Sequence, residues 1–322
     1  MNQAFTPPFY IRGAFAQTFL ASYKYGTQRN NPILKNAQEV ILNPVGDIRL
    51  QGFYSPQPKA TAKGVVMLLH GWEGSVNSAY ILRTGKFLYE HGYSIFRLNY
   101  RDHGETHHLN PGIFYAVLLD EVFGAVQQVS HYEPQLPFYL AGFSMGGNFA
   151  LRIARKSITT PISNLKHIFS ISPVLDPEKS TYAIDKYPLI QKHFRQKWID
   201  SMRKKRALFP ERYNFDDVFS LPTITAMTER MIQRYSDYPT SAEYFRAYAV
   251  TGDALAALST PLTVITAQDD PIIPVSDFYD LKLSATSELI IHPHGGHNGF
   301  FENLSGRAWY QTKIIETIQP LG

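Results

Sequence analysis

One serine stands in a short glycine-rich motif where a predicted strand gives way to a predicted helix. Ser144 lies within Gly142-Phe143-Ser144-Met145-Gly146. The apolar run at 138–141 predicts a buried strand, and residues 147–155 predict a helix with an apolar face. A sharp turn between the two needs small neighbours, because the backbone is strained, and it lifts the hydroxyl out of the sheet. Ser144 is therefore the candidate nucleophile; the competing interpretation is a buried serine in a tight turn.

An acid and a histidine follow, in the order that such a nucleophile requires. A predicted strand at 262–267 leads to Asp269 and Asp270, and another at 288–291 leads to a glycine-rich loop that contains His297. A carboxylate just past a strand end can orient an imidazole, and the imidazole can act as a general base. Two adjacent acids point in different directions, so only one of them can face the histidine.

Several strings in the chain resemble the YheT-like branch of the α/β-hydrolase superfamily, whose members are predicted serine esterases. The matching strings are residues 12–18, 70–78, 99–105, 142–148, 267–271 and 294–300. By this resemblance the catalytic triad maps onto Ser144, Asp270 and His297, and Asp269 becomes a turn-capping residue. The string at 99–104 matches only loosely and the predicted cap matches weakly, so substrate choice does not carry over.

The resemblance and the alternation of predicted strands and helices imply an α/β-hydrolase fold, with a mostly parallel central sheet flanked by helices and a helical cap insertion. We expect an N-terminal arm at residues 1–36 whose aromatic side chains pack on the core. Residues 37–176 and 261–322 are then the catalytic domain, and residues 177–260 the cap. One flanking helix is expected near residues 113–130.

In this fold two backbone N–H groups form the oxyanion hole. One comes from the loop after the third strand and the other from the residue after the nucleophile. The apolar run 65–69 and the loop that follows it make Trp72 and Met145 the expected donors. His70, in the same loop, is expected to hold the loop through a hydrogen bond rather than to act as a base.

Composition excludes several classes of site. The chain of 322 residues has no cysteine, which excludes disulfides, thiol catalysis and thiolate metal sites. Proline and glycine interrupt the histidines at 292–297, so they are not spaced as a regular metal site, and neither a metal nor a cofactor is expected. There is no leader pattern and no long apolar run, so we expect a cytoplasmic protein.

Positive charge is concentrated in one part of the predicted cap. The formal net charge is +4, yet the stretch from Lys192 to Arg212 (the basic stretch) holds eight basic and two acidic residues. Such a run is usually a solvated helix face; the alternative is attraction to anionic lipid headgroups or acidic substrates. Weak contact between the cap and an anionic membrane surface is therefore a hypothesis. No accompanying motif points to nucleic acid, so none is expected as a partner.

The expected function is hydrolysis of small or lipid-like acyl esters through an acyl-enzyme. An acyltransferase that uses an alcohol acceptor, a thioesterase or lipase, and a non-catalytic binding protein remain alternatives. Product analysis with added alcohol separates the first of these, and a fluorophosphonate label separates the last. The cap aromatics either line an acyl pocket or form the cap's own core; they are Phe194, Trp198, Phe209, Tyr213, Phe215 and Phe219.

Overall fold

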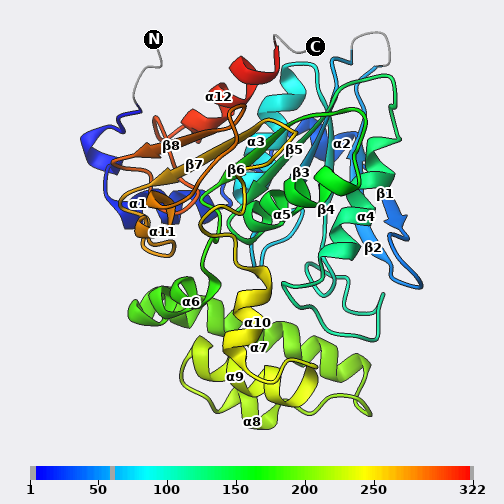
Figure 1. The fold of residues 1–322 in the computed structure, drawn as a ribbon, viewed down its shortest axis with the longest axis vertical. Coiled ribbons are helices and arrows are strands. Elements are labelled where there is room, and N and C mark those ends of the chain that lie inside the picture. The colour runs from blue at the N-terminus through cyan, green and yellow to red at the C-terminus, as the bar shows by residue number, and fades with distance from the viewer. Residues whose placement is uncertain (1–4, 59–61, 320–322) are drawn as a thin grey trace.

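A single eight-stranded sheet crosses the protein, and helices cover both of its faces (Figure 1). The computed structural model describes residues 5–58 and 62–319. The strands follow the spatial order β1-β2-β4-β3-β5-β6-β7-β8. They are β1 (Gln38–Leu42), β2 (Leu50–Ser55), β3 (Val65–Leu69), β4 (Ser94–Leu98), β5 (Phe138–Phe143), β6 (Leu165–Ile171), β7 (Leu262–Ala267) and β8 (Glu288–His292).

The parallel strands of the sheet all end at the same edge. β2 is antiparallel to both β1 and β4, and every other neighbouring pair is parallel. The loops after β3, β4, β5, β7 and β8 therefore leave the sheet at a common carboxyl edge, where ligands bind in sheets of this kind. This sheet confirms the α/β-hydrolase fold expected from the sequence.

The apolar strands fill two core layers with alternate side chains. In β3, Val65, Met67 and Leu69 contribute to one layer, while Val66 and Leu68 contribute to the other, as the two-residue period of a strand requires. Helices α4 and α5 pack on the first face, and α3 and α12 on the second. These helices are α3 (Ala79–Glu90), α4 (Leu119–Ser130), α5 (Met145–Thr159) and α12 (Trp309–Ile318).

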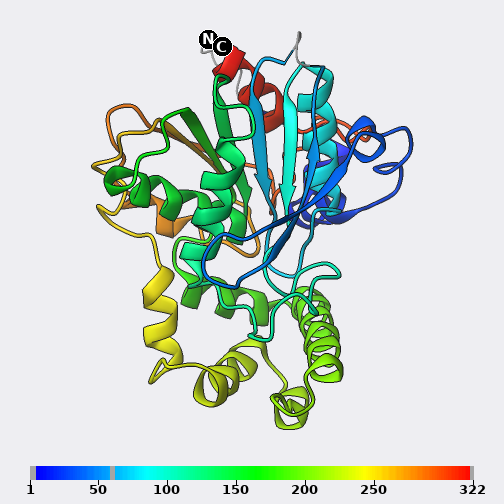
Figure 2. The same ribbon diagram turned by 90° about the vertical axis from the view of Figure 1, so that its right-hand side faces the viewer.

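Five helices between β6 and β7 form a separate group at one end of the sheet, in both Figure 1 and Figure 2. They are α6 (Pro177–Lys186), α7 (Pro188–Leu208), α8 (Asp216–Phe219), α9 (Ile224–Tyr235) and α10 (Ser241–Tyr248), here called the insertion helices. The Asn148 side-chain amide, on α5, donates to the carbonyls of Val174 and Tyr248 at 2.8 Å each. One buried side chain on α5 thus holds both ends of the insertion.

The expected helix at 113–130 begins later, at Leu119. The backbone before Leu119 forms hydrogen bonds with other elements. The N–H of Ala116 donates to the Tyr244 hydroxyl at 3.0 Å, and the Ala116 carbonyl accepts from Arg152 at 2.6 Å. These bonds tie residues 113–118 to the insertion and to α5 instead of to a helix.

The N-terminal arm packs on the core differently from the expectation. It contains the short helices η1 (Phe9–Ile11), α1 (Ala14–Ser22) and α2 (Pro32–Lys35), and a further short helix, α11 (Ser276–Tyr279), follows β7. Phe5 and Ile11 are buried, whereas Phe9 and Tyr25 are 84% and 83% exposed. The expectation that the arm's aromatics pack on the domain is therefore wrong for most of them. Polar contacts add to the attachment, because the buried Gln17 side chain bonds to both the N–H and the carbonyl of Phe301.

Candidate active site

Ser144 occupies a strained turn between the end of β5 and the start of α5. Its φ is 56° and its ψ is −117°, a backbone conformation that a residue with a side chain rarely adopts. Two glycines make the turn sterically possible. A Cβ on Gly142 would overlap the backbone of Gly146, and a Cβ on Gly146 would overlap the carbonyl of Leu69. The sequence motif thus has a steric cause, and it holds the Ser144 hydroxyl at the carboxyl edge of the sheet.

Asp270 and His297 meet beyond the ends of β7 and β8. The Nδ1 atom of His297 lies 2.9 Å from Oδ2 of Asp270, whose side chain is fully buried. The other oxygen, Oδ1, accepts the N–H groups of Ile272 and Ile273 at 2.8 and 3.0 Å. Because an ionised carboxylate can only accept, Nδ1 of His297 carries the shared hydrogen, and Nε2 is the ring nitrogen left to face the substrate side.

Asp269 contacts the loop after β8 at Gly296 and His294. Its Oδ1 accepts the N–H of Gly296 at 2.9 Å, and its Oδ2 lies 3.4 Å from Nδ1 of His294. It therefore bridges the loops after β7 and β8, a larger role than the turn cap expected from the sequence. Of the two adjacent acids, only Asp270 has a hydrogen bond to the His297 ring in the described part of the chain.

The N-terminal arm supplies a support for His297 that the sequence did not reveal. The hydroxyl of Thr18, on α1, accepts the backbone N–H of His297 at 2.9 Å and donates to the Ala14 carbonyl at 2.7 Å. The sequence does not predict this contact, because Thr18 and His297 are 279 positions apart. Thr18 fixes the backbone from which the imidazole projects.

The loop after β3 approaches Ser144 closely. A Cβ on Gly71 would lie 3.1 Å from Cβ of Ser144, and the Gly71 N–H donates to the Tyr80 hydroxyl at 2.9 Å. The N–H of Trp72, the next residue, has no acceptor among residues 5–58 and 62–319. The N–H of Met145 is the first of α5, where helical N–H groups lack an acceptor within the helix. Both N–H groups are thus available to an oxyanion, and Tyr80 is a second support that sequence reasoning missed.

His70 holds the same loop, as expected. Its Nδ1 donates to the Gly71 carbonyl at 2.7 Å, and its ring packs against Tyr100 and His103. Burial lowers the pKa of His70 well below the usual range, so the ring is neutral. A neutral ring bonded to the backbone serves as a brace for the loop.

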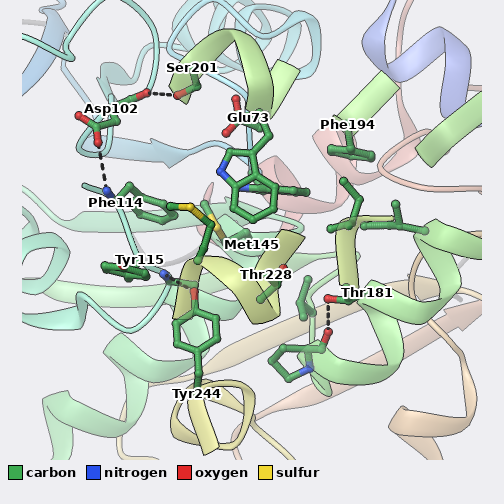
Figure 3. A pocket seen from close by; sticks show the side chains of 18 of the residues that line it. Glu73, Asp102, Phe114, Tyr115, Met145, Thr181, Phe194, Ser201, Thr228 and Tyr244 are labelled. Atoms are coloured by element: carbon green, nitrogen blue, oxygen red, sulfur yellow. Dashed lines mark hydrogen bonds between the residues drawn. The ribbon is translucent and has the colours of Figure 1, made fainter. Parts of the chain in front are cut away.

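Two cavities meet at Ser144. The inner pocket lies between the sheet and the insertion helices, and Met145 lines it (Figure 3). Its lining is mainly apolar. Of the six aromatic residues expected in the cap, Phe194, Trp198 and Phe215 line this pocket, whereas Phe209, Tyr213 and Phe219 do not. The second cavity, here called the outer groove, lies between α1 and the first half of α7, and His297 lines it.

A buried ion pair contributes to the lining of the inner pocket. Nζ of Lys205, on α7, donates to Oδ1 of Asp102 at 2.8 Å and to the Asn110 carbonyl at 2.6 Å. Burial raises the pKa of Asp102 and lowers the pKa of Lys205, so each charge depends on the other. Glu73 lines the same pocket, and desolvation raises its pKa from 4.5 to about 8, which favours the neutral carboxylic acid near pH 7.

The basic stretch is a solvated helix face only in part. Lys205 is buried, Lys204 pairs with Glu105 at 2.8 Å, and Arg206 pairs with Asp216. The excess of free positive charge is therefore smaller than the sequence indicates. In residues 5–58 and 62–319, no helix is both long and apolar enough to cross a membrane, and no group of three His, Cys, Asp or Glu side chains is placed to hold a metal ion. His292, at the end of β8, packs against Trp309 instead.

Relatives of known name match almost the whole chain at low identity. The chain is 23% identical to phospholipase ABHD3 of Bos taurus, a match that covers 98% of this chain and 78% of the relative. It is 23% identical to monoacylglycerol lipase of Saccharomyces cerevisiae, over 84% of this chain and 63% of the relative. An abhydrolase domain-containing protein of Dictyostelium discoideum is 24% identical, over 97% and 80%.

Solved structures share the fold. The Pyrococcus furiosus esterase Pf2001 superposes with a TM-score of 0.55 at 15% identity, over 98% of each chain. Mouse alpha/beta hydrolase domain-containing protein 10 gives a TM-score of 0.54 at 13% identity, over 89% of this chain and 100% of that one. The family described as Hydrolase_4, serine aminopeptidase S33, matches residues 60–303, which is most of the chain. This protein therefore belongs to that family of α/β-hydrolases.

Proposed function

We propose that this protein is an esterase or lipase that hydrolyses carboxylic acyl esters through an acyl-enzyme on Ser144. The observation that carries the proposal is geometric. Ser144, on its strained turn, lines the same groove as His297, whose Nδ1 lies 2.9 Å from the buried Asp270. Relatives named as lipase and phospholipase support an ester substrate. The strings described above favour placement in the YheT-like branch.

Each step of the reaction uses one of these groups. Nε2 of His297 takes the Ser144 proton as Oγ attacks the ester carbonyl, and the Trp72 and Met145 N–H groups bind the resulting oxyanion. When the tetrahedral intermediate collapses, the carbon–oxygen bond to the alcohol breaks and His297 gives its proton to the departing oxygen. Water then attacks the acyl-enzyme by the same route and releases the acid. Asp270 keeps His297 in the required tautomer and stabilises the imidazolium.

The charges in the cavities favour esters over peptides with a free amino terminus. An aminopeptidase needs an unpaired carboxylate for the α-ammonium group of its substrate. The inner pocket offers two carboxyls, but Asp102 is paired with Lys205, and the raised pKa of Glu73 keeps it neutral near pH 7. No carboxylate side chain lines the outer groove within the described residues. The family's descriptive name therefore does not decide the substrate.

The test is hydrolysis of p-nitrophenyl esters of increasing acyl length by the wild type and by Ser144→Ala. We expect turnover by the wild type only, with matching thermal unfolding of both proteins, because Ser144 contributes little to the core. Activity that survives in Ser144→Ala, or a wild type inactive on the whole series, would contradict the proposal. Adding a primary alcohol and analysing products by mass spectrometry distinguishes hydrolysis from acyl transfer.

A further inference from the structure

The two cavities that meet at Ser144 differ in which catalytic group they contain. Met145, whose N–H is a proposed oxyanion donor, lines the inner pocket and not the outer groove. His297 lines the outer groove and not the inner pocket. Ser144 and Trp72 line both. The reacting carbonyl is thus placed where the two cavities join, with the base on one side only.

This asymmetry assigns the two halves of an ester. His297 must hand its proton to the leaving oxygen, so the alcohol half lies on the side of His297. The acyl half then extends into the inner pocket, whose lining is mainly apolar. The apolar side chains that line it include Ile184, Met202, Phe215, Met231 and Phe245. The outer groove receives the leaving alcohol.

The outer groove is positively charged. Lys24, two residues beyond α1, and Lys197, on α7, both line it, and no carboxylate does among the described residues. Within residues 5–58 and 62–319, neither ammonium group lies within ion-pair distance of a carboxylate; Lys197 donates to the Glu73 carbonyl at 3.1 Å. Each lysine therefore has a charge that no neighbouring carboxylate compensates at short range.

The two ammonium groups are close enough to influence each other. Desolvation is the largest cause that lowers the pKa of Lys197; attraction to the Glu73 carboxyl opposes this shift, and repulsion by Lys24 adds to it. Glu73 compensates the Lys197 charge only when it is ionised, and desolvation raises the Glu73 pKa to about 8, so this compensation is partial near pH 7. Two like charges held at one groove mouth are unfavourable until an anion binds between them.

The rim of the groove is apolar as well as basic. Phe15, Phe19 and Leu189 line it and are 55%, 64% and 85% exposed. A small polar alcohol would leave these side chains uncovered, whereas an amphipathic alcohol would cover them. The ligand that fits is an alcohol with both an apolar part and a negative charge.

We propose that the outer groove binds the leaving alcohol of the substrate, and that Lys24 and Lys197 select alcohols that carry an anionic group such as a phosphate or carboxylate. This inference rests on the proposed esterase function and adds the chemical class of the alcohol half. It also gives a role to Lys197, a residue of the basic stretch that takes no part in the proposed hydrolytic mechanism.

A matched pair of chromogenic esters tests the assignment. The anionic probe is 3-(octanoyloxy)-4-nitrobenzoate, and the neutral probe is its methyl ester. Both have the same acyl chain and release a nitrophenol. Each kcat/KM is divided by the probe's own hydroxide-catalysed rate to correct for leaving-group reactivity, and initial rates are followed at the nitrophenol while mass spectrometry checks that the methyl ester stays intact. The ratio of the corrected values then reports the negative charge on the leaving group. We expect the wild type to prefer the anionic probe, and the preference to shrink as salt screens the lysines.

The variants Lys24→Gln and Lys197→Gln should each lower that ratio by about twofold to tenfold, because the loss of kcat/KM is larger for the anionic probe than for the neutral one. The control is Lys192→Gln, on the same helix. The groove-lining residues of α7 include positions 190, 193, 194 and 197, which share one helical face, whereas Lys192 lies on the opposite face and does not line the groove. This control should leave the ratio unchanged.

The outcomes separate the two proposals. If Ser144-dependent hydrolysis occurs with no preference for the anionic probe, or if both lysine variants lose the two activities equally, the groove assignment is overturned and the esterase function stands. If neither probe is hydrolysed, both are overturned. A ratio that falls in Lys24→Gln and Lys197→Gln but not in Lys192→Gln supports the assignment.

Discussion

Replacing Asp270 with asparagine isolates the orienting role of one carboxylate at almost constant shape. Oδ1 of Asp270 accepts two backbone N–H groups, from Ile272 and Ile273. An asparagine must keep its carbonyl oxygen on that side, because its NH₂ group cannot accept. The NH₂ group then faces Nδ1 of His297, which must become an acceptor, and the ring proton moves to Nε2. The nitrogen that should take the Ser144 proton is thereby blocked.

Asp270→Asn should lower kcat because His297 can no longer act as the base, although the rest of the site stays in place. Serine proteases lose on the order of 10⁴-fold in kcat from the corresponding change, equivalent to about 5.5 kcal/mol in activation free energy. We expect a loss of that order for Asp270→Asn in p-nitrophenyl ester hydrolysis. The thermal unfolding midpoint should change little, since the two backbone hydrogen bonds to Oδ1 are kept.

Asp269→Asn is the matched control. Its carbonyl oxygen can still accept the Gly296 N–H, and only the longer contact with His294, at 3.4 Å, loses its charge. We expect kcat to stay within about fivefold of the wild type, the size of an exposed ion pair. A greater loss in Asp269→Asn than in Asp270→Asn would refute the assignment of the acid.

Three further changes test the supports of the site. Thr18→Val removes the acceptor for the His297 N–H and should cost about 1–3 kcal/mol of unfolding free energy, together with a lower kcat. Thr18→Ser should retain both, and equal behaviour of the two variants would contradict the role. The pKa of Glu73 is raised in the folded state, so the folded protein keeps a proton that the unfolded chain releases above pH 4.5, and stability falls as pH rises toward about 8. Glu73→Gln should remove this fall, which is at most about 5 kcal/mol; an unchanged pH profile in urea unfolding would contradict it. Asp102→Asn leaves the Lys205 charge unpaired and should cost about 3–5 kcal/mol, whereas adding Lys205→Met should restore much of it. A double variant no more stable than Asp102→Asn would contradict the pairing.

The local parts of the site could be predicted from the sequence because their causes are local. The turn at Ser144 needs glycines two residues before and two residues after it, so the five residues 142–146 are enough to predict the turn. Asp270 and His297 each follow an apolar strand, and parallel strands bring their ends to one edge. The catalytic roles of these residues stay proposals until activity is measured.

Contacts between distant segments could not be predicted. Thr18 reads as an ordinary helical residue, and only the docking of α1 brings it to His297. Lys205 lies in a run of basic residues, which indicates a solvent-facing helix, yet its Nζ is buried against Asp102. Tyr80 fills one turn of an amphipathic helix, and its hydroxyl reaches Gly71 only in the folded chain. In each case the role of the residue depends on a contact that forms only in the folded chain.

Three expectations drawn from the sequence are tested neither by the structure nor by its relatives. Cytoplasmic location, contact of the cap with anionic membranes and the domain boundaries at residues 36, 176 and 260 stay predictions. The pairing of Lys204 and Arg206 reduces the free charge on which membrane contact depends. Vesicle sedimentation at low and high salt measures that contact directly.

The central claim is that Ser144 is a nucleophile activated by His297. A fluorophosphonate reacts with an activated serine and leaves a stable phosphonyl adduct, which peptide mass spectrometry locates. We predict one adduct per chain, on the peptide that contains Ser144, no adduct in Ser144→Ala and much slower labelling in His297→Ala. An adduct on another residue, or labelling that is unchanged in Ser144→Ala, would contradict the account.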